Sequence, residues 1–197
     1  MKQSPNNYAF VDGANLYNGV KEQGWLIDYK RLRKWLADKL DVQNAYLFIG
    51  LMPKNSDMYR SLQEAGYILI FKPTVTDPDG RVKGNCDADM VLHIVSNTYE
   101  DKFDQAVLIT SDGDFYSTVE FLKKRDKLKR LLSPSPNCSI LLKRLGVGIT
   151  YLHDIKPLIE YKKKKPPMKT IHHQGSFRSN PASNVAKTTK KVNKPKG

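Results

Sequence analysis

The sequence predicts an α/β fold in which a mostly parallel central sheet is covered by helices on both faces. Short apolar runs typical of buried strands alternate with longer segments whose apolar residues repeat at helical spacing. Asp and Gly directly follow two of these runs, at the points where buried strands would end. This alternation favours βαβ units, in which functional groups gather beyond the carboxyl ends of the strands.

The first predicted strand spans residues 8–11, and Asp12-Gly13 after it fits a strand that ends in a turn. The next two runs, AYLFIGL and YILIF, are continuous and apolar; the first is expected to be a buried strand and the second a further strand. The later strands are expected at 45–51, 67–71, 105–110, 128–132 and 148–152.

The clearest helix is expected from Asp28, which can cap it, to Leu40, because Leu32, Leu36 and Leu40 share one face. A second helix is expected to end at Gly66, a residue that readily adopts the left-handed conformation of a helix C-terminus. The segment 76–80 is expected to be a turn. The further helices are expected at 57–65, at 87–98, from 114 to about 124, and at 139–145.

The charge divides the chain into two parts. The formal net charge is +13, but residues 1–160 hold all 20 acidic and 22 of the 33 basic residues. Residues 161–197 hold the other 11 basic residues and no acid. We therefore expect one folded domain over 1–160, followed by a basic tail over 161–197 that suits a polyanionic partner.

Several classes of protein are excluded or disfavoured. No apolar run is long enough to span a membrane, and the N-terminal segment lacks the apolar core of a signal peptide, so a cytoplasmic location is expected. Cys86 and Cys138 have no zinc-ligand spacing and are expected to be reduced thiols. There is no Walker A loop and no GxGxxG motif, which disfavours a nucleotide cofactor.

Acidic residues are expected to meet at one edge of the sheet. Asp12 directly follows the first strand in FVDGAN, and Asp112 directly follows the fourth in ITSDGDF. Carboxylates that converge in a cleft repel each other unless a divalent cation lies between them, and oxygen ligands suit Mg²⁺ or Mn²⁺. Asn15 adds an amide that can orient a water or a carboxylate. This chemistry suggests hydrolysis of phosphodiester bonds.

The segment KGNCDADMVLH offers two more acids. On a helix that begins near Asp87, this residue lies within the arc of the apolar residues Met90 and Ile94. Asp89 and His93 lie on the opposite side; Asp89 is expected to be solvated, and His93 to face solvent or a neighbouring loop. The helical arrangement therefore favours Asp87 over Asp89 as the site residue.

The three motifs FVDGAN, KGNCDADMVLH and ITSDGDF, in this order, resemble the NYN branch of the PIN-like nucleases, the group of LabA-like and DUF88 proteins. The resemblance covers about residues 8–160. It implies a PIN-like three-layer sandwich and a metal-dependent ribonuclease-type site. By motif match, the family's acids fall on Asp12, Asp87, Asp112 and Asp114, with Asn15 beside them. Asp114 has an alternative role as the cap of the helix that follows.

The tail begins with Lys162, Lys163, Lys164 and Lys165 and continues with few apolar residues, so it is expected to be disordered. Its cations are expected to bind phosphates without sequence specificity; the alternative is a solubilising end with no partner. Together these features predict a nuclease that depends on Mg²⁺ or Mn²⁺ and acts on RNA. The alternative is an RNA-binding or scaffold protein that keeps the fold but turns over little.

Overall fold

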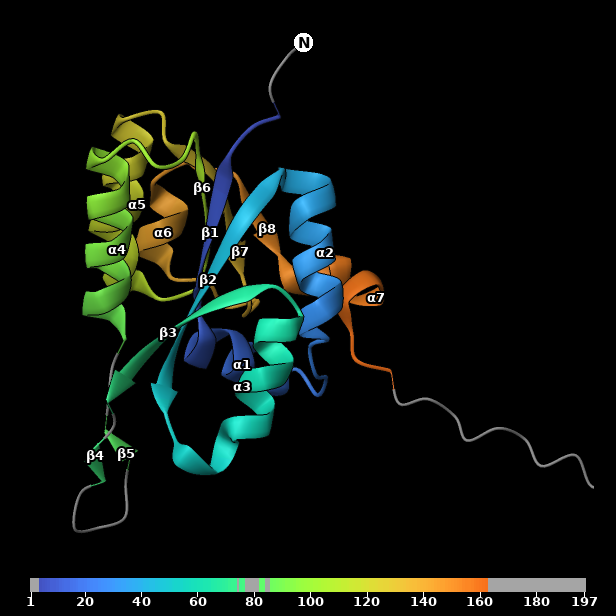
Figure 1. Ribbon diagram of the computed structural model, residues 1–197. Coiled ribbons are helices and arrows are strands. Elements are labelled where there is room, and N and C mark those ends of the chain that lie inside the picture. The colour runs from blue at the N-terminus through green and yellow to red at the C-terminus, as the bar shows by residue number, and fades with distance from the viewer. Residues whose placement is uncertain (1–3, 74, 77–81, 84–85, 163–197) are drawn as a thin grey trace, which may run out of the picture. The chain divides into compact units, whose positions relative to one another are not determined.

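The computed structural model describes residues 4–73, 75–76, 82–83 and 86–162. Its central strands are β1 (Asn7–Asp12), β2 (Val42–Leu51), β3 (Tyr67–Pro73), β6 (Ala106–Ile109), β7 (Leu128–Ser133) and β8 (Ile149–Tyr151). They form one six-stranded sheet in the order β3-β2-β1-β6-β7-β8. Figure 1 labels these strands. Every neighbouring pair is parallel, which confirms the predicted α/β fold.

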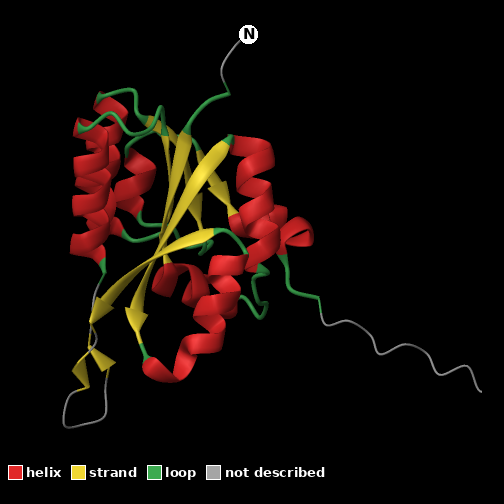
Figure 2. Ribbon diagram, in the orientation of Figure 1, coloured by secondary structure: helices red, strands yellow, loops and turns green. Residues whose placement is uncertain are grey.

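Helices cover both faces of this sheet (Figure 2). On one face lie α1 (Gly13–Lys21), α2 (Tyr29–Leu40), α3 (Ser56–Glu64) and α7 (Lys156–Ile159). On the other lie α4 (Asp87–Tyr99), α5 (Tyr116–Lys124) and α6 (Ile140–Arg144). The short 3-10 helices are η1 (Pro53–Asn55), η2 (Gly113–Phe115) and η3 (Leu152–Ile155), and β4 (Val75–Thr76) pairs antiparallel with β5 (Val82–Lys83).

The apolar strands supply two separate cores because successive side chains point to opposite faces of the sheet. Val11 of β1 and Val107 of β6 belong to the core under α1, α2, α3 and α7. Phe10, one residue before Val11, and Leu108, one residue after Val107, belong to the core under α4, α5 and α6. All four are fully buried, as continuous apolar runs in a doubly covered parallel sheet should be.

The strand order reverses at β1. From β1 the chain first builds β2 and β3 on one side, and then crosses to build β6, β7 and β8 on the other. The connections from β1 and from β6 therefore leave toward opposite faces, which opens a crevice between their carboxyl ends. Asp12 ends β1, and Asp112 lies three residues after the last residue of β6, so the fold brings both acids to this crevice.

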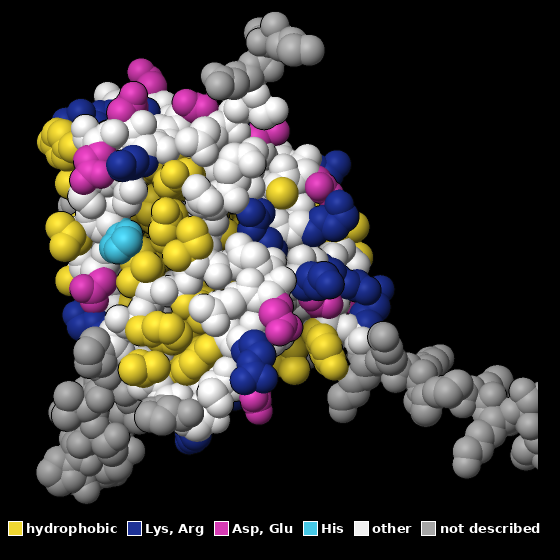
Figure 3. Space-filling model, in the orientation of Figure 1, with side chains coloured by type: hydrophobic (Ala, Val, Ile, Leu, Met, Phe, Trp, Pro, Cys, Tyr) yellow, Lys and Arg dark blue, Asp and Glu magenta, His cyan; other side chains and the backbone are white. Residues whose placement is uncertain are grey.

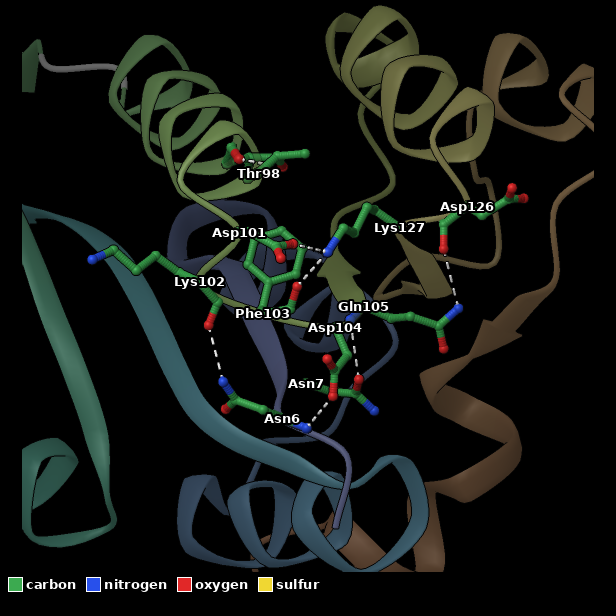
Figure 4. A network of polar contacts seen from close by, with 11 residues as sticks. Asn6, Asn7, Thr98, Asp101, Lys102, Phe103, Asp104, Gln105, Asp126 and Lys127 are labelled. Carbon is green, nitrogen blue, oxygen red and sulfur yellow. Dashed lines mark hydrogen bonds and ion pairs between the residues drawn. The ribbon is translucent and has the colours of Figure 1, made fainter. Parts of the chain in front are cut away.

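The opposite end of the sheet is fixed by polar contacts (Figure 4). The backbone amide of Asn6 donates to a carboxylate oxygen of Asp104 at 2.7 Å, and its side chain donates to the carbonyl of Lys102 at 2.9 Å. The side-chain oxygen of Asn7 accepts from the backbone amide of Gln105 at 3.2 Å. These contacts tie the beginning of β1 to the segment that enters β6, and so fix the register of the two strands that carry the acids.

Helix α1 was not expected from the sequence. Instead of ending in a turn at Asp12-Gly13, β1 leads directly into a helix that begins at Gly13. The helix buries only two apolar side chains, Leu16 and Val20, so its apolar periodicity is weak in the sequence. Of the turn expected at 76–80, only Thr76 lies within the described residues, and it belongs to β4.

His93 faces the sheet, and not solvent or a neighbouring loop as expected from its helical angle. Its ring packs against Tyr46 and Phe48 of β2, with ring centroids 5.8 and 5.5 Å apart. The helix α4 is buried along Met90, Ile94 and Thr98, so His93 lies on the flank that meets β2. Apolar side chains are visible beside this flank, over β2 and β3, in Figure 3. Within the described part of the chain, no helix is long and apolar enough to cross a membrane.

Candidate metal centre

A cavity of about 510 Å³ opens beyond the carboxyl ends of β1, β2 and β6. Its walls come from segments far apart in the chain: α1, the end of β2, the start of α4, and the segments that follow β6 and β7. It is lined by Asp12, Ala14, Asn15, Asn18, Gly19, Glu22, Phe48, Ile49, Gly50, Cys86, Asp87, Ser111, Asp112 and Ser135.

Asp12 is held at the end of β1 as the N-cap of α1. Its Oδ1 accepts from the backbone amide of Asn15 at 3.0 Å. The pKa of Asp12 is raised from 3.8 to about 6. Burial is the largest cause and the charges of Asp87 and Asp112 add to it, while the amides of Asn15 and Ala14 oppose the shift. The carboxylate is thus partly desolvated and close to two other negative charges, a position that a cation would stabilise.

Gly13 allows this arrangement because α1 begins against the backbone of β2. A Cβ at this position would lie 2.7 Å from the carbonyl oxygen of Phe48 and would also collide with Ile49. Gly113, after Asp112, is similarly crowded, since a Cβ there would lie 2.5 Å from Oγ of Ser139. The glycine in each Asp-Gly pair is therefore explained by close approach, which lets each acid sit tightly over the sheet edge.

Asn15 joins the two strand ends. Its side-chain oxygen accepts from both the backbone amide and the hydroxyl of Ser111, at 2.9 and 2.8 Å. Because a backbone amide can only donate, this pair fixes which end of the Asn15 amide is oxygen. The Asn15 nitrogen remains as the donor end of the amide, and Asn15 lines the cavity. Asn15 is thus rigidly placed, which is compatible with its predicted role of orienting a water or a carboxylate.

Asp112 lies in the loop after β6 and caps η2. Its backbone amide donates to Oγ1 of the buried Thr110 at 3.1 Å, and its Oδ1 accepts from the amide of Asp114 at 3.0 Å. An ionised carboxylate has two oxygens with about four acceptor positions, so this single cap bond leaves capacity for a further ligand. Asp112 therefore combines a fixed orientation with free coordinating capacity.

Asp87, Asp112 and Asp114 form a group whose ligand oxygens all lie within 4.8 Å of one another. Asp114 is exposed, whereas Asp87 and Asp112 are half-buried. Asp114 does not cap α5, because Phe115 occupies the N-cap position of that helix and makes no side-chain cap bond. Asp12 lies outside this group of three, although its pKa responds to both Asp87 and Asp112.

Asp89 lies elsewhere, although it belongs to the same first turn of α4 as Asp87. Its Oδ2 pairs with Nζ of Lys72 at the end of β3, at 2.9 Å. Asp87 lines the cavity and Asp89 does not. Asp89 is half-buried and ion-paired, so its expected exposure to solvent was wrong.

The remaining sequence expectations concern thiols and cations. Cys86 and Cys138 are free, and burial raises the pKa of Cys86, which favours the neutral thiol over a metal-binding thiolate. Lys162 is exposed at the end of the described chain. The other tail lysines in the predicted nucleic-acid contact, Lys163, Lys164 and Lys165, lie outside the described residues.

Sequence reasoning missed four residues of this centre. Ser111 was part of a quoted motif but was not singled out, and its bond to Asn15 joins residues 96 positions apart. Asn18 and Glu22 were missed because α1 was missed; their spacing from Asn15 would have placed all three on one helix face. Ser135, in the segment after β7, had no sequence signal.

The parallel sheet, its reversal at β1 and the acidic cavity at that point define an α/β protein of the PIN-like type. Comparison with known proteins agrees: the NYN domain profile matches residues 8–145. The chain therefore belongs to the NYN domain family, within the PIN-like nuclease superfamily.

Two individual proteins are similar to this chain. The low amplitude and bright protein LabA of Synechococcus elongatus is 26% identical over 168 residues, which cover 80% of this chain and 89% of LabA. A solved structure of a protein of unknown function from Vibrio parahaemolyticus matches with a TM-score of 0.66 and 22% identity. That match covers 81% of this chain and 98% of the other, and it supports the shared fold.

The raised pKa of Asp12 predicts that Asp12→Asn stabilises the metal-free protein at neutral pH. A raised pKa means that the stability present below pH 4 is lost as the pH rises through 6, because the buried carboxyl must ionise. Asn removes this cost and still caps α1. We expect a gain of about 1–3 kcal/mol at pH 7 that shrinks toward pH 4.

Urea unfolding in EDTA across this pH range measures the effect. A variant that is less stable than wild type at pH 7, or a difference that does not change with pH, would contradict the burial of an ionised Asp12. Adding Mn²⁺ is expected to stabilise the wild type more than the variant.

Proposed function

We propose that this protein is a ribonuclease that hydrolyses phosphodiester bonds with Mg²⁺ or Mn²⁺ held at the acidic cavity. The observation that carries the proposal is the group formed by Asp87, Asp112 and Asp114, whose oxygens lie within 4.8 Å of one another at the reversal point of the sheet. Membership of the NYN family supports the reaction class, and the basic tail supports a nucleic-acid substrate.

The donor set fits a hard divalent cation. Three carboxylates supply only oxygen, which suits Mg²⁺ or Mn²⁺ rather than zinc. Asp12 adds a fourth negative charge from the end of β1, close enough for Asp87 and Asp112 to raise its pKa. Without a cation, this concentration of charge in a partly dry cavity would be costly.

In this proposal Asp87, Asp112 and Asp114 hold the cation, and Asp12 completes the acidic wall. When bound, a divalent cation polarises a phosphate oxygen and lowers the pKa of a water. The chain's own groups fix the geometry: Ser111 holds Asn15, Asn15 presents its amide nitrogen as a donor, and the cap bonds hold Asp12 and Asp112. Positioning of this kind is a large part of catalysis of phosphoryl transfer.

The tail is proposed to supply affinity for the RNA backbone. Its 11 cations carry nearly all of the surplus charge, whereas the acidic cavity by itself would repel a polyanion. Each contact with a phosphate releases counterions, so affinity from the tail is sensitive to salt and indifferent to sequence.

Removing residues 163–197 is expected to weaken RNA binding and to flatten its salt dependence. For single strands, each lost phosphate contact lowers the slope of log affinity against log salt by about 0.7. Fluorescence anisotropy with labelled single-stranded RNA measures the affinity and its salt slope, and EDTA prevents cleavage. The salt concentration is varied from about 50 to about 200 mM, because phosphate contacts lose much of their affinity over this range. An unchanged slope would show that the tail does not contact RNA.

The test of the proposed function is cleavage of labelled single- and double-stranded RNA and DNA, each with Mg²⁺, Mn²⁺ or EDTA. We expect RNA cleavage that requires the metal and is lost in an Asp12→Asn/Asp112→Asn double variant purified in the same way. If neither protein cleaves but both bind RNA, the chain is a binding or scaffold protein. If both cleave equally, the activity comes from a contaminant.

A further inference from the structure

One face of α1 forms a wall of the cavity that extends beyond the acidic group. Asn15, Asn18, Gly19 and Glu22 all line the cavity, and they recur at helical spacing along α1 and its C-terminal end. A rise of 1.5 Å per residue places Glu22 about 10 Å along the helix axis from Asn15. That distance is comparable to the reach of one nucleotide, so the wall can contact a base while the next phosphate lies at the acids.

This wall is held rigidly against the segment after β7. Gly19 lets α1 approach Pro134, since a Cβ there would lie 2.8 Å from the proline ring. The side chain of Gln23 donates to the carbonyl of Pro134 at 2.7 Å. The hydroxyl of Ser133 donates to the carbonyl of Ser135 at 2.6 Å, which fixes the opposite side of the wall. The surface is therefore preformed, as a recognition site requires.

The carboxylate of Glu22 is exposed and makes no ion pair or hydrogen bond with the described residues. By contrast, Glu120 and Glu160 each pair with a lysine one turn away. An unpaired carboxylate repels phosphate and can only accept hydrogen bonds. The groups that it can bind in a nucleotide are therefore donors. Within a strand the ribose offers one, the 2′-hydroxyl, whereas a base edge can offer two donors side by side.

We propose that Glu22, with Asn18 beside it, recognises the Watson–Crick edge of a guanine next to the scissile phosphate. This inference rests on the proposed function. Guanine presents two adjacent donors, N1–H and the N2 amino group, which match the two oxygens of a carboxylate. Adenine and cytosine each present a donor beside an acceptor, and uracil a single donor between two acceptors. Single-stranded RNA exposes these edges for recognition by side chains.

The substitution Glu22→Gln tests the geometry directly. Glutamine presents one acceptor and one donor, which match N6 and N1 of adenine rather than the two donors of guanine. We expect wild type to prefer a guanine-containing strand by roughly 5- to 150-fold, the range for one bidentate contact. Glu22→Gln is expected to lose that preference and to favour adenine.

The experiment uses four single-stranded RNA oligonucleotides that are oligouridine except for one central G, A, C or U. Binding is measured by anisotropy in Ca²⁺ with the full-length Asp112→Asn protein, with and without Glu22→Gln, so that the readout does not require cleavage. Wild-type cleavage sites in Mn²⁺ are mapped on the same strands. Glu100→Gln is a matched control, because Glu100 ends α4 outside the cavity lining and Glu22 ends α1.

Guanine preference that Glu22→Gln removes and Glu100→Gln retains supports the inference. Equal binding of all four strands by the protein with Glu22, or a preference that Glu22→Gln leaves unchanged, overturns it. Failure of the proposed function is distinguishable, because it is an absence of metal-dependent cleavage in wild type whatever the binding preference. Circular dichroism of each variant shows whether a lost preference reflects a lost fold.

Discussion

Asp87→Asn is expected to lower the rate of metal-dependent RNA cleavage by on the order of 10²–10³-fold while leaving the protein folded. Loss of a carboxylate ligand weakens the hold on a cation whose charge stabilisation is worth several kcal/mol, and about 1.4 kcal/mol corresponds to tenfold in rate. Asp87 is half-buried and belongs to the group whose oxygens lie within 4.8 Å. Single-turnover cleavage of single-stranded RNA at several Mn²⁺ concentrations measures the loss.

Asp89→Asn is the matched control for this prediction. It makes the same chemical change in the same helical turn, but Asp89 pairs with Lys72 and does not line the cavity. We expect its cleavage rate to stay within a few-fold of wild type, since partly exposed ion pairs contribute little. Equal losses in the two variants would mean that the change acts through α4 as a whole and not through a metal ligand.

Gly13→Ala is expected to destabilise the protein by about 2–3 kcal/mol. The added methyl group would collide with Ile49 and would approach the carbonyl oxygen of Phe48 to 2.7 Å, and that oxygen belongs to a strand held on both sides. Overpacking of this kind costs roughly 1–3 kcal/mol or more, and the better helix propensity of alanine offsets only a part of it. Thermal unfolding should show a melting temperature lower by roughly 4–10 °C.

Gly148→Ala is the control for the glycine substitution. The atoms nearest to a Cβ at Gly148 belong to the flexible side chain of Arg130, with the guanidinium group closest, and this side chain can move aside. Gly148→Ala is therefore expected to destabilise the protein clearly less than Gly13→Ala does. If Gly13→Ala unfolds at the same temperature as wild type, α1 does not begin in close contact with β2. The explanation given for the position of Asp12 would then be wrong as well.

The predicted parts of the fold have strong local signals. Asp28 caps α2 by accepting from the amide of Arg31 at 3.1 Å, and Leu32, Leu36 and Leu40 are buried on one face, as their spacing predicts. The apolar runs in the middle of the sheet, residues 9–11 of β1 and 106–109 of β6, became strands buried on both faces. The edge strand β3 did not, because Ile68 and Phe71 are 41% and 39% exposed. Because parallel strands end at one edge, the position of an acid after each of two such runs was enough to predict that they lie near each other.

The missed parts depend on contacts between distant segments. Helix α1 buries only two large apolar side chains, and its start is set by how closely Gly13 approaches β2, which no local pattern records. The bond between Asn15 and Ser111 joins helix α1 to the loop after β6, which only the sheet brings together. His93 has a solvent-side helical angle, yet it packs on β2 because α4 lies across the sheet with that flank inward.

The central claim is that the acidic group holds the cation on which RNA hydrolysis depends. The most direct test titrates Mn²⁺ into wild type and into the Asp12→Asn/Asp112→Asn double variant by calorimetry, and measures RNA cleavage over the same concentrations. Wild type is expected to bind Mn²⁺, and cleavage is expected to rise over the concentration range in which binding saturates. In the double variant both are expected to be lost. Cleavage that persists in EDTA, or that is equal in the double variant, would contradict the central claim.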